Sequence, residues 1–307
     1  MNLVLLSVLL IALQQAQGSS SQPWLLKPNV LVVEKEMQST VEVPLICGES
    51  FEGAEISWRN EGEELGQRGN RITVTVEEMM AGNYTCHDSA GALLGHQLVL
   101  VQVQGGQRQR KILKGSDNAD YIKCSSKNYG GIFRCSWQWS NERKGSVVLI
   151  SATRSSDGRD ITCTLDSDEA GITCTDQFQC AYSEEQDHIE LEVYVRSLYR
   201  LEKYFSSFSI SEIVKPDSVH IAKLQGSTFE LQYPETWSVP ASFFPLRFHI
   251  KVVPHKKDCD YEAQSRTQVI FTQNQTFSVN NRREFLLCVR AQDPLCNSAW
   301  SEWSKYE

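Results

Sequence analysis

The feature that most constrains this 307-residue chain is a set of ten cysteines that all follow an apolar N-terminal stretch. That stretch, residues 3–13, is about eleven residues long, too short to span a bilayer but right for the core of a signal peptide. Small side chains at Ala16 and Gly18 predict cleavage after Gly18, so we expect residues 1–18 to be a signal peptide. Cysteines in a secreted chain predict disulfides first. The ten stand at positions 47, 86, 124, 135, 163, 174, 180, 259, 288 and 296.

Cys47, Trp58, Tyr84 and Cys86 stand in the order typical of an immunoglobulin domain. The two cysteines would bridge two sheets, with Trp58 packed on the bridge and Tyr84 at the tyrosine-corner position. A bridge of this span stabilises a fold by roughly 3–4 kcal/mol in the chain-entropy description. Short β-branched runs separated by polar clusters surround these residues, so we predict an all-β chain whose residues 19–105 form an immunoglobulin-like sandwich.

Two further cysteine pairs have the same short spacing in the middle of the chain. Cys124 and Cys135 are 11 residues apart, as are Cys163 and Cys174, and we predict a local cross-strand disulfide for each pair. Cys180 follows six residues later and has no obvious partner. A polar, glycine-bearing linker over residues 104–111 precedes this segment, which we assign to a second domain of residues 106–214.

Pro216 marks the entry to a third segment, residues 215–307, because proline fixes φ and cannot donate a ladder hydrogen bond. Alternating apolar residues then predict strands at 229–233, 246–252 and 285–291. Three cysteines, 259, 288 and 296, lie in this segment. Alternation places Cys288 on the outward face beside Arg290, so we expect a surface bridge from Cys288 to either neighbour, with one thiol left over.

Near the C-terminus the chain reads Trp300, Ser301, Glu302, Trp303 and Ser304. In a polyproline-like turn, two indoles three residues apart project on one side. Their faces can then sandwich a guanidinium of a neighbouring strand, and Arg290 is the first candidate, with Arg247 and Lys251 also facing outward. Each such contact contributes roughly 0.5–1 kcal/mol, so the motif is expected to stiffen its domain more than to bind a partner.

Composition and motifs exclude several functions. The net charge of −8 argues against nucleic-acid binding, and a basic cluster at residues 251–257 is at most a minor site for sulfated sugar. The sequence contains no catalytic constellation, metal-ligand spacing or cofactor fingerprint. We therefore expect that the protein is not an enzyme and binds no metal or cofactor. No second apolar run of membrane-spanning length follows the leader, so we expect a secreted protein without a membrane span. Sequons predict glycans at Asn83 and Asn274.

Together these modules resemble the extracellular part of a class I cytokine receptor. More specifically, the mature chain is similar to the family of beta subunits shared by interleukin-12 and interleukin-23, over its whole length. The stretches that carry this resemblance are residues 126–131, 213–217, 233–238 and 289–293. The resemblance implies one immunoglobulin-like sandwich followed by two fibronectin type III-like sandwiches. It also implies that the chain pairs with a four-helix-bundle alpha subunit to form a heterodimeric cytokine, and that its first domain contacts a cell-surface receptor.

The resemblance further assigns roles to particular residues. Cys180 matches the family's interchain cysteine, which bonds to the alpha subunit. The alpha-subunit pocket maps onto Tyr129, Glu184, Pro234 and Asp293, where a basic partner side chain would pair with Asp293. The mammalian members have aromatic residues after the position of Asp293, whereas this chain has Pro294, Leu295 and Cys296. One wall of the pocket is therefore expected to differ.

Other functions stay open at this point. A soluble cytokine receptor alpha chain, which captures a separately secreted ligand, differs chiefly in not needing Cys180. An adhesion module leaves the Cys-x-Trp and Trp-Ser-x-Trp-Ser motifs unexplained, and an unrecognised hydrolase is a remote alternative. The identity of the alpha subunit and the formation of homodimers also stay open.

Overall fold

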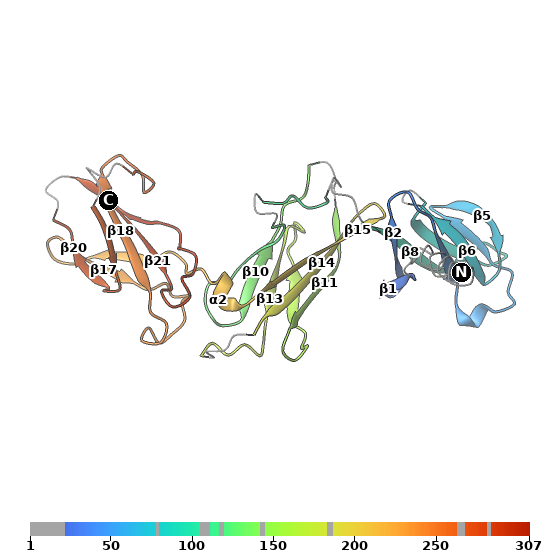
Figure 1. Cartoon of the computed structure of the whole chain (residues 1–307), viewed down its shortest axis with the longest axis horizontal. Coiled ribbons are helices and arrows are strands. Elements are labelled where there is room, and N and C mark those ends of the chain that lie inside the picture. The colour runs from blue at the N-terminus through green and yellow to red at the C-terminus, as the bar shows by residue number, and fades with distance from the viewer. Residues whose placement is uncertain are drawn as a thin grey trace, which may run out of the picture. The chain divides into compact units, whose positions relative to one another are not determined.

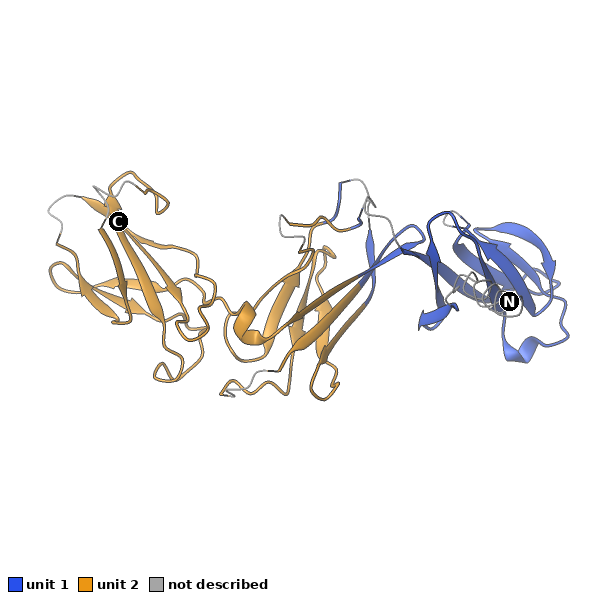
Figure 2. Ribbon diagram, viewed as in Figure 1, with its two compact units in different colours: residues 1–112, 139–149, 194–203 blue, residues 113–138, 150–193, 204–307 orange. Residues whose placement is uncertain are grey.

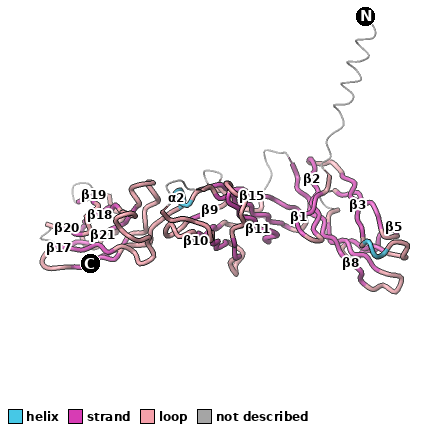
Figure 3. The backbone as a smooth tube through the Cα atoms, turned by 90° about the horizontal axis from the view of Figure 1, so that it is seen from below, coloured by secondary structure: helices cyan, strands magenta, loops and turns pink. Residues whose placement is uncertain are grey.

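The structure is a computed structural model, and nearly every element in its described part is a strand, which confirms the prediction of an all-β chain (Figure 3). The helical segments among the described residues are η1 (Glu49–Phe51) and α2 (Ile210–Ile213). The described residues are 22–77, 80–104, 111–116, 120–141, 145–182, 187–262, 268–280 and 284–307. The predicted signal peptide, residues 1–18, lies outside them.

The chain divides by its contacts into two compact units (Figure 2). Unit 1 consists of residues 1–112, 139–149 and 194–203, and unit 2 consists of residues 113–138, 150–193 and 204–307. The long strands β11 (Ser146–Arg154), β14 (Ile189–Ser197) and β15 (Arg200–Phe208) contribute residues to both units. The domain boundaries at 105/106 and 214/215 stay a prediction.

Unit 1 contains the first eight strands, coloured blue to cyan in Figure 1, and their pairings with one another are antiparallel except for that of β2 with β8. β3 pairs with β6, while β5, β4, β7 and β8 follow one another in the larger sheet, and β2 runs parallel to β8. Their bounds are β1 Trp24–Lys27, β2 Val30–Glu36, β3 Val41–Ile46, β4 Ser57–Asn60, β5 Glu63–Arg68, β6 Arg71–Val76, β7 Gly82–His87 and β8 Leu93–Gln104.

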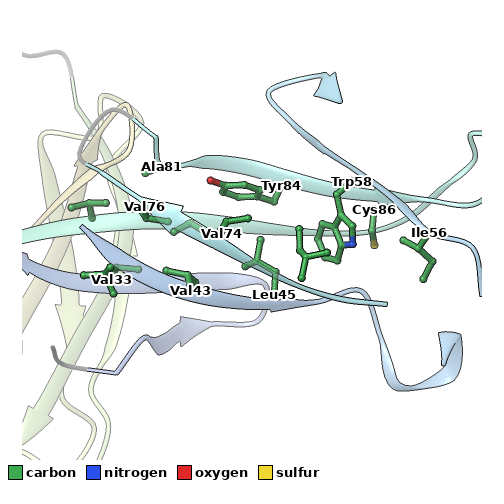
Figure 4. Close-up of a cluster of buried hydrophobic side chains, with 14 residues drawn as sticks. Val33, Val43, Leu45, Ile56, Trp58, Val74, Val76, Ala81, Tyr84 and Cys86 are labelled. Atoms are coloured by element: carbon green, nitrogen blue, oxygen red, sulfur yellow. The ribbon is translucent and has the colours of Figure 1, made fainter. Parts of the chain in front are cut away.

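The core of unit 1 forms around Trp58 and Cys86 (Figure 4), and Cys86 is joined to Cys47 by a disulfide. Trp58 is buried and donates from its indole nitrogen to the carbonyl of Gly69 at 2.9 Å. Tyr84 is also buried, and its hydroxyl donates to the carbonyl of Met80 at 2.8 Å, which is the contact of a tyrosine corner. The sandwich forms because strands such as β6 alternate exposed and buried side chains, so one face of each sheet must be covered.

Unit 2 begins with a four-stranded sheet in the order β12-β13-β10-β9. Cys124 faces Cys135 across β9 and β10, and Cys163 faces Cys174 across β12 and β13. Each pair is joined by a disulfide with the Cα atoms 4.0 Å apart, so two short hairpins are fixed covalently. The bounds are β9 Lys123–Ser125, β10 Ile132–Ser136, β12 Thr162–Leu165 and β13 Gly171–Thr175.

The rest of unit 2 holds two smaller sheets, β16-β17-β20 and β19-β18-β21-β22. The helix α2 precedes them and starts with a capping box, in which Ser209 and Glu212 satisfy each other's backbone donors. The long strands β18 and β21 pair along their whole length and form the frame of the second sheet. The bounds are β16 His220–Lys223, β17 Thr228–Gln232, β18 Arg247–Pro254, β19 Gln268–Thr272, β20 Thr276–Ser278, β21 Phe285–Gln292 and β22 Ser304–Tyr306.

Candidate partner-binding site

Aromatic rings from three segments of unit 2 gather around Tyr129. The Tyr129 ring stacks on Phe244 with ring centres 5.4 Å apart and meets Trp237 edge-on at 6.0 Å. These three side chains are buried. Phe243 and Tyr182 continue the cluster outward, with ring centres 5.1 Å apart, and they are 45% and 54% exposed. The cluster therefore has a buried floor and an exposed edge of large apolar surface.

A carboxylate lies beneath this cluster. Asp293, at the end of β21, is 1% exposed, and its Oδ2 accepts a hydrogen bond from the Tyr129 hydroxyl at 2.7 Å. Its Oδ1 accepts from the backbone N–H of Leu295 at 2.7 Å. Within the described part of the chain no lysine or arginine pairs with it. The site thus holds a buried acidic group whose hydrogen-bond donors are neutral.

Tyr129 and Cys296, which lie beside that carboxylate, are both held in their protonated forms. Burial, with hydrogen bonds to Cys296 and Asp293, raises the pKa of Tyr129 far above its ordinary value, so the phenol stays protonated. The Cys296 sulfur lies 3.3 Å from the Tyr129 oxygen. Because the phenol proton is directed at Asp293, the thiol is the donor in that contact. Burial also raises the pKa of Cys296, which keeps it a thiol and a poor nucleophile.

The turn after β17 positions the site from the other side. Trp237 donates its backbone N–H to the carbonyl of Pro234 at 2.9 Å, which closes the turn that carries the indole. The Tyr129 backbone N–H donates to the hydroxyl of Ser238 at 3.1 Å, and the Asn128 side-chain amide donates to the carbonyl of Thr236 at 2.7 Å. The turn and the 126–131 segment therefore hold each other in place.

Of the four residues that the resemblance assigned to the pocket, the structure brings Tyr129 and Asp293 into contact. Pro234 is half-buried at the start of the neighbouring turn, and its carbonyl accepts the Trp237 backbone N–H. Glu184 lies outside the described residues. The sequence did not identify Phe243, Phe244 and Tyr182, although a pair of adjacent phenylalanines in a loop is a signal that could have been followed.

Cys180 is exposed and forms no disulfide. It lies two residues before Tyr182, whose hydroxyl donates to the carbonyl of Val239 at 2.9 Å. An exposed thiol thus lies in the same segment as the exposed edge of the aromatic cluster. Cys296 is the other free cysteine, and it is only half-buried.

One expectation about the third segment's cysteines is wrong. Cys288 is fully buried and bonds to Cys259, which is buried as well, so this bridge is not on the surface. Alternation does place Cys288 on the same face as Arg290, but the segment around Cys259, Tyr261 and Trp303 packs over it. The thiol left over is Cys296.

The two tryptophans of the terminal motif form a ladder with three cations. The guanidinium of Arg290 lies 5.0 Å from the Trp300 ring centre and 4.4 Å from that of Trp303. Arg247 lies over the Trp300 ring and Lys251 over the Trp303 ring, each 5.6 Å from the ring centre. Lys251 is buried here and donates to the carbonyl of Cys259, so it does not belong to a surface basic cluster. The rings and cations of the ladder therefore contact one another within a single domain.

Both sequon asparagines have exposed side chains, Asn83 in β7 and Asn274 after β19. In the part of the chain that the structure describes, no three His, Cys, Asp or Glu side chains gather as metal ligands would. A helix long and apolar enough to cross a membrane is likewise not found among the described residues.

Residues 119–197 match a sequence profile described as cytokine interleukin-12p40 C-terminus. Along nearly its whole length, the chain is similar to proteins named interleukin-12 subunit beta. The protein from Mesocricetus auratus is 31% identical over 305 residues, with 91% of each chain covered. The protein from Homo sapiens is 31% identical over 309 residues, with 92% of each chain covered.

Proposed function

Because this chain belongs to the family of interleukin-12 beta subunits, we propose that it is secreted and pairs covalently with a four-helix-bundle alpha subunit. The chain is a cytokine subunit, as its relatives are. The pair forms a heterodimeric immune cytokine of the interleukin-12 or interleukin-23 type, which signals through cell-surface cytokine receptors. The first domain, residues 19–105, contacts such a receptor.

The observation that carries this proposal is the exposed, unpaired Cys180. Eight of the ten cysteines are used in four disulfides, and Cys296 is half-buried against Tyr129. An exposed odd cysteine in a secreted protein tends to bond to another chain. Cys180 is therefore the cysteine that joins the alpha subunit.

The alpha subunit docks on the aromatic cluster beside Cys180. The exposed side chains of Tyr182, Val239 and Phe243 form the apolar edge of this cluster. Buried aromatic residues with a central charge are typical of the few contacts that dominate the free energy of binding. Asp293 supplies that charge, and it attracts a basic side chain of the partner, ideally an arginine that forms two hydrogen bonds. To reach the carboxylate, the arginine displaces the Tyr129 hydroxyl that now donates to it.

Two further features fit a secreted chain. Asn83 and Asn274 have exposed side chains, and we propose that each carries an N-linked glycan. Cys180 also offers a bond to a second copy of this chain when no alpha subunit is present.

The alternative is a soluble receptor alpha chain that binds a separately secreted helical cytokine without a covalent bond. Co-expression with an interleukin-12 alpha subunit of the same organism distinguishes the two functions. We expect non-reducing gels to show a disulfide-linked heterodimer that is lost in the Cys180→Ser variant. The Cys180→Ser chain should still co-purify with the alpha subunit as a non-covalent complex. A linked band that survives in the Cys180→Ser chain would refute the assignment of Cys180. A non-covalent complex with unmodified Cys180 would favour the alternative.

A further inference from the structure

A buried carboxylate, Asp176, holds the segment that presents Cys180. Asp176 follows β13, is almost fully buried, and accepts the backbone N–H of Phe178 on its Oδ1 at 2.9 Å. Its carbonyl accepts the backbone N–H of Gln179 at 3.4 Å. These bonds fix a turn that ends immediately before Cys180. The position of the thiol therefore depends on the position of Asp176.

Arg154, in β11, joins the two sides of the loop that carries Cys180. Its Nη1 lies 2.8 Å from Oδ2 of Asp176 and its Nε lies 3.1 Å from Oδ2 of Asp187. Asp176 precedes the loop and Asp187 follows it, so one guanidinium closes the loop at its base. All three side chains are largely buried, which strengthens the two ion pairs relative to exposed ones.

The surroundings of Asp187 favour the ionised form of its carboxyl group. Burial opposes ionisation, but hydrogen bonds from Ser156 and Ser155 and the charge of Arg154 outweigh it and keep the pKa of Asp187 below its ordinary value. The carboxylate is therefore ionised at neutral pH and available to the guanidinium. A lysine at position 154 would keep the charge but would reach only one carboxylate at a time, because an ammonium lacks the planar fork of arginine.

The same turn packs against the segment that carries Tyr129. The Asp176 backbone N–H donates to the carbonyl of Gly131 at 2.9 Å. Gly131 has a φ of +82°, and a Cβ there would lie 2.6 Å from the Asp176 carbonyl oxygen and 2.7 Å from Cβ of Gln179. Only glycine fits so close to the turn. The base of the Cys180 loop and the floor of the aromatic cluster thus share one backbone contact.

From this geometry we infer that Arg154 is a positioning residue for the interchain disulfide, acting through Asp176 and Asp187 without touching the partner. The inference rests on the proposed function of Cys180. In the bond-forming step, the thiols of Cys180 and of a partner cysteine give up two electrons and two protons to a disulfide oxidant, which is reduced to two thiols. The ion pairs of Arg154 with Asp176 and Asp187 keep Cys180 near its partner thiol in the docked complex. This raises the effective concentration of one thiol at the other.

The test compares Arg154→Lys with Arg134→Lys. Arg134 pairs with Asp166 at 2.7 Å in the same unit, but its side chain is 62% exposed, and Asp166 lies outside the segment between Asp176 and Asp187. Each variant is co-expressed with the interleukin-12 alpha subunit, and the interchain bond is reduced mildly and allowed to re-form in a glutathione redox buffer. We expect re-formation to be about 3- to 10-fold slower in Arg154→Lys and unchanged in Arg134→Lys, because a loosened loop lowers the effective concentration.

A second measurement separates positioning from general damage. In a Cys180→Ser background, Arg154→Lys should lower the affinity for the alpha subunit by a smaller factor than it lowers the re-formation rate. Tyr182 lies on the loosened loop, but Tyr129 keeps its contacts with Phe244 and Asp293. Equal re-formation rates in the two lysine variants, or an equal loss of affinity and rate, would overturn the inference.

If Arg154→Lys is not secreted, Asp187→Asn replaces it, since the amide keeps the size of the side chain. It should slow re-formation in the same way, and an unchanged rate overturns the inference as well. Failure of the proposed function looks different, because the unsubstituted chain would then form no linked heterodimer at all.

Discussion

Two places in unit 2 combine aromatic rings with charges, and they differ in how the charges are satisfied. In the ladder of Trp300 and Trp303, three cations alternate with two rings, and every layer comes from this chain. In the site around Tyr129, the Asp293 carboxylate has neutral donors and the outer rings are exposed. The ladder is a finished structural element, whereas the Tyr129 site is a surface that a partner can complete.

The largest effect is expected at the unfinished site. Asp293→Asn keeps acceptors for Tyr129 and Leu295 but removes the charge, so the fold should be retained. Losing one member of a buried charge pair costs about 2–5 kcal/mol of binding free energy. Affinity for the alpha subunit, measured in a Cys180→Ser background by surface plasmon resonance, should fall accordingly. Unchanged affinity would show that Asp293 is a structural acid and that the comparison is wrong.

A smaller effect concerns a histidine inside the ladder. Burial, together with the nearby charges of Arg290 and Lys251, lowers the pKa of His249 to about 4, and Arg290 donates from Nε to its Nδ1 at 3.1 Å. Between pH 6.5 and 4 the unfolded chain therefore binds a proton that the folded chain does not. The free energy of unfolding should fall by about 2 kcal/mol as the pH drops through this range.

Chemical denaturation of the parent and of His249→Phe at several pH values checks this effect. The variant keeps a ring against Phe271 and Trp303 but cannot titrate, so its stability should decline less between pH 6.5 and 4. Parallel curves for the two proteins would mean that His249 titrates normally and is more open to water than its 9% exposure indicates.

The smallest effect is expected from the central cation of the ladder. Arg290→Met keeps an apolar stem between the two indoles but removes two cation–π contacts, which are worth about 1–2 kcal/mol together. Thermal unfolding should show a lower Tm, while affinity for the alpha subunit stays at the parental value. A loss of affinity without a loss of stability would make the ladder a contact surface after all.

These two places also differ in how far the sequence predicted them. The ladder could be predicted because Trp300 and Trp303 are three residues apart and Arg290 alternates outward on a single strand. The pairing of Cys47 with Cys86 around Trp58 followed in the same way from fixed spacing within one sandwich. Such features depend on local periodicity, which a sequence displays directly.

The Tyr129 site depends on contacts between distant segments instead. Tyr129 and Asp293 are separated by 164 residues, and only a family resemblance indicated that they meet. Phe243, Phe244 and Tyr182 lie in loops without periodicity, and the adjacency of the two phenylalanines was the one sequence signal that marked this cluster. Cys288 was misjudged because alternation predicts the face of a strand but not what packs over that face. The contact of Cys296 with Tyr129 had no sequence signal at all.

The most direct test of the central claim is peptide mapping of the protein purified from its natural source without reduction. Mass spectrometry would identify what is bonded to the peptide that contains Cys180. We expect a peptide of a helical cytokine subunit on Cys180, with Cys296 recovered as a free thiol. Recovery of Cys180 as a free thiol, or joined to Cys296, would contradict the account that the Tyr129 site and its neighbouring cysteine form the interface with the alpha subunit.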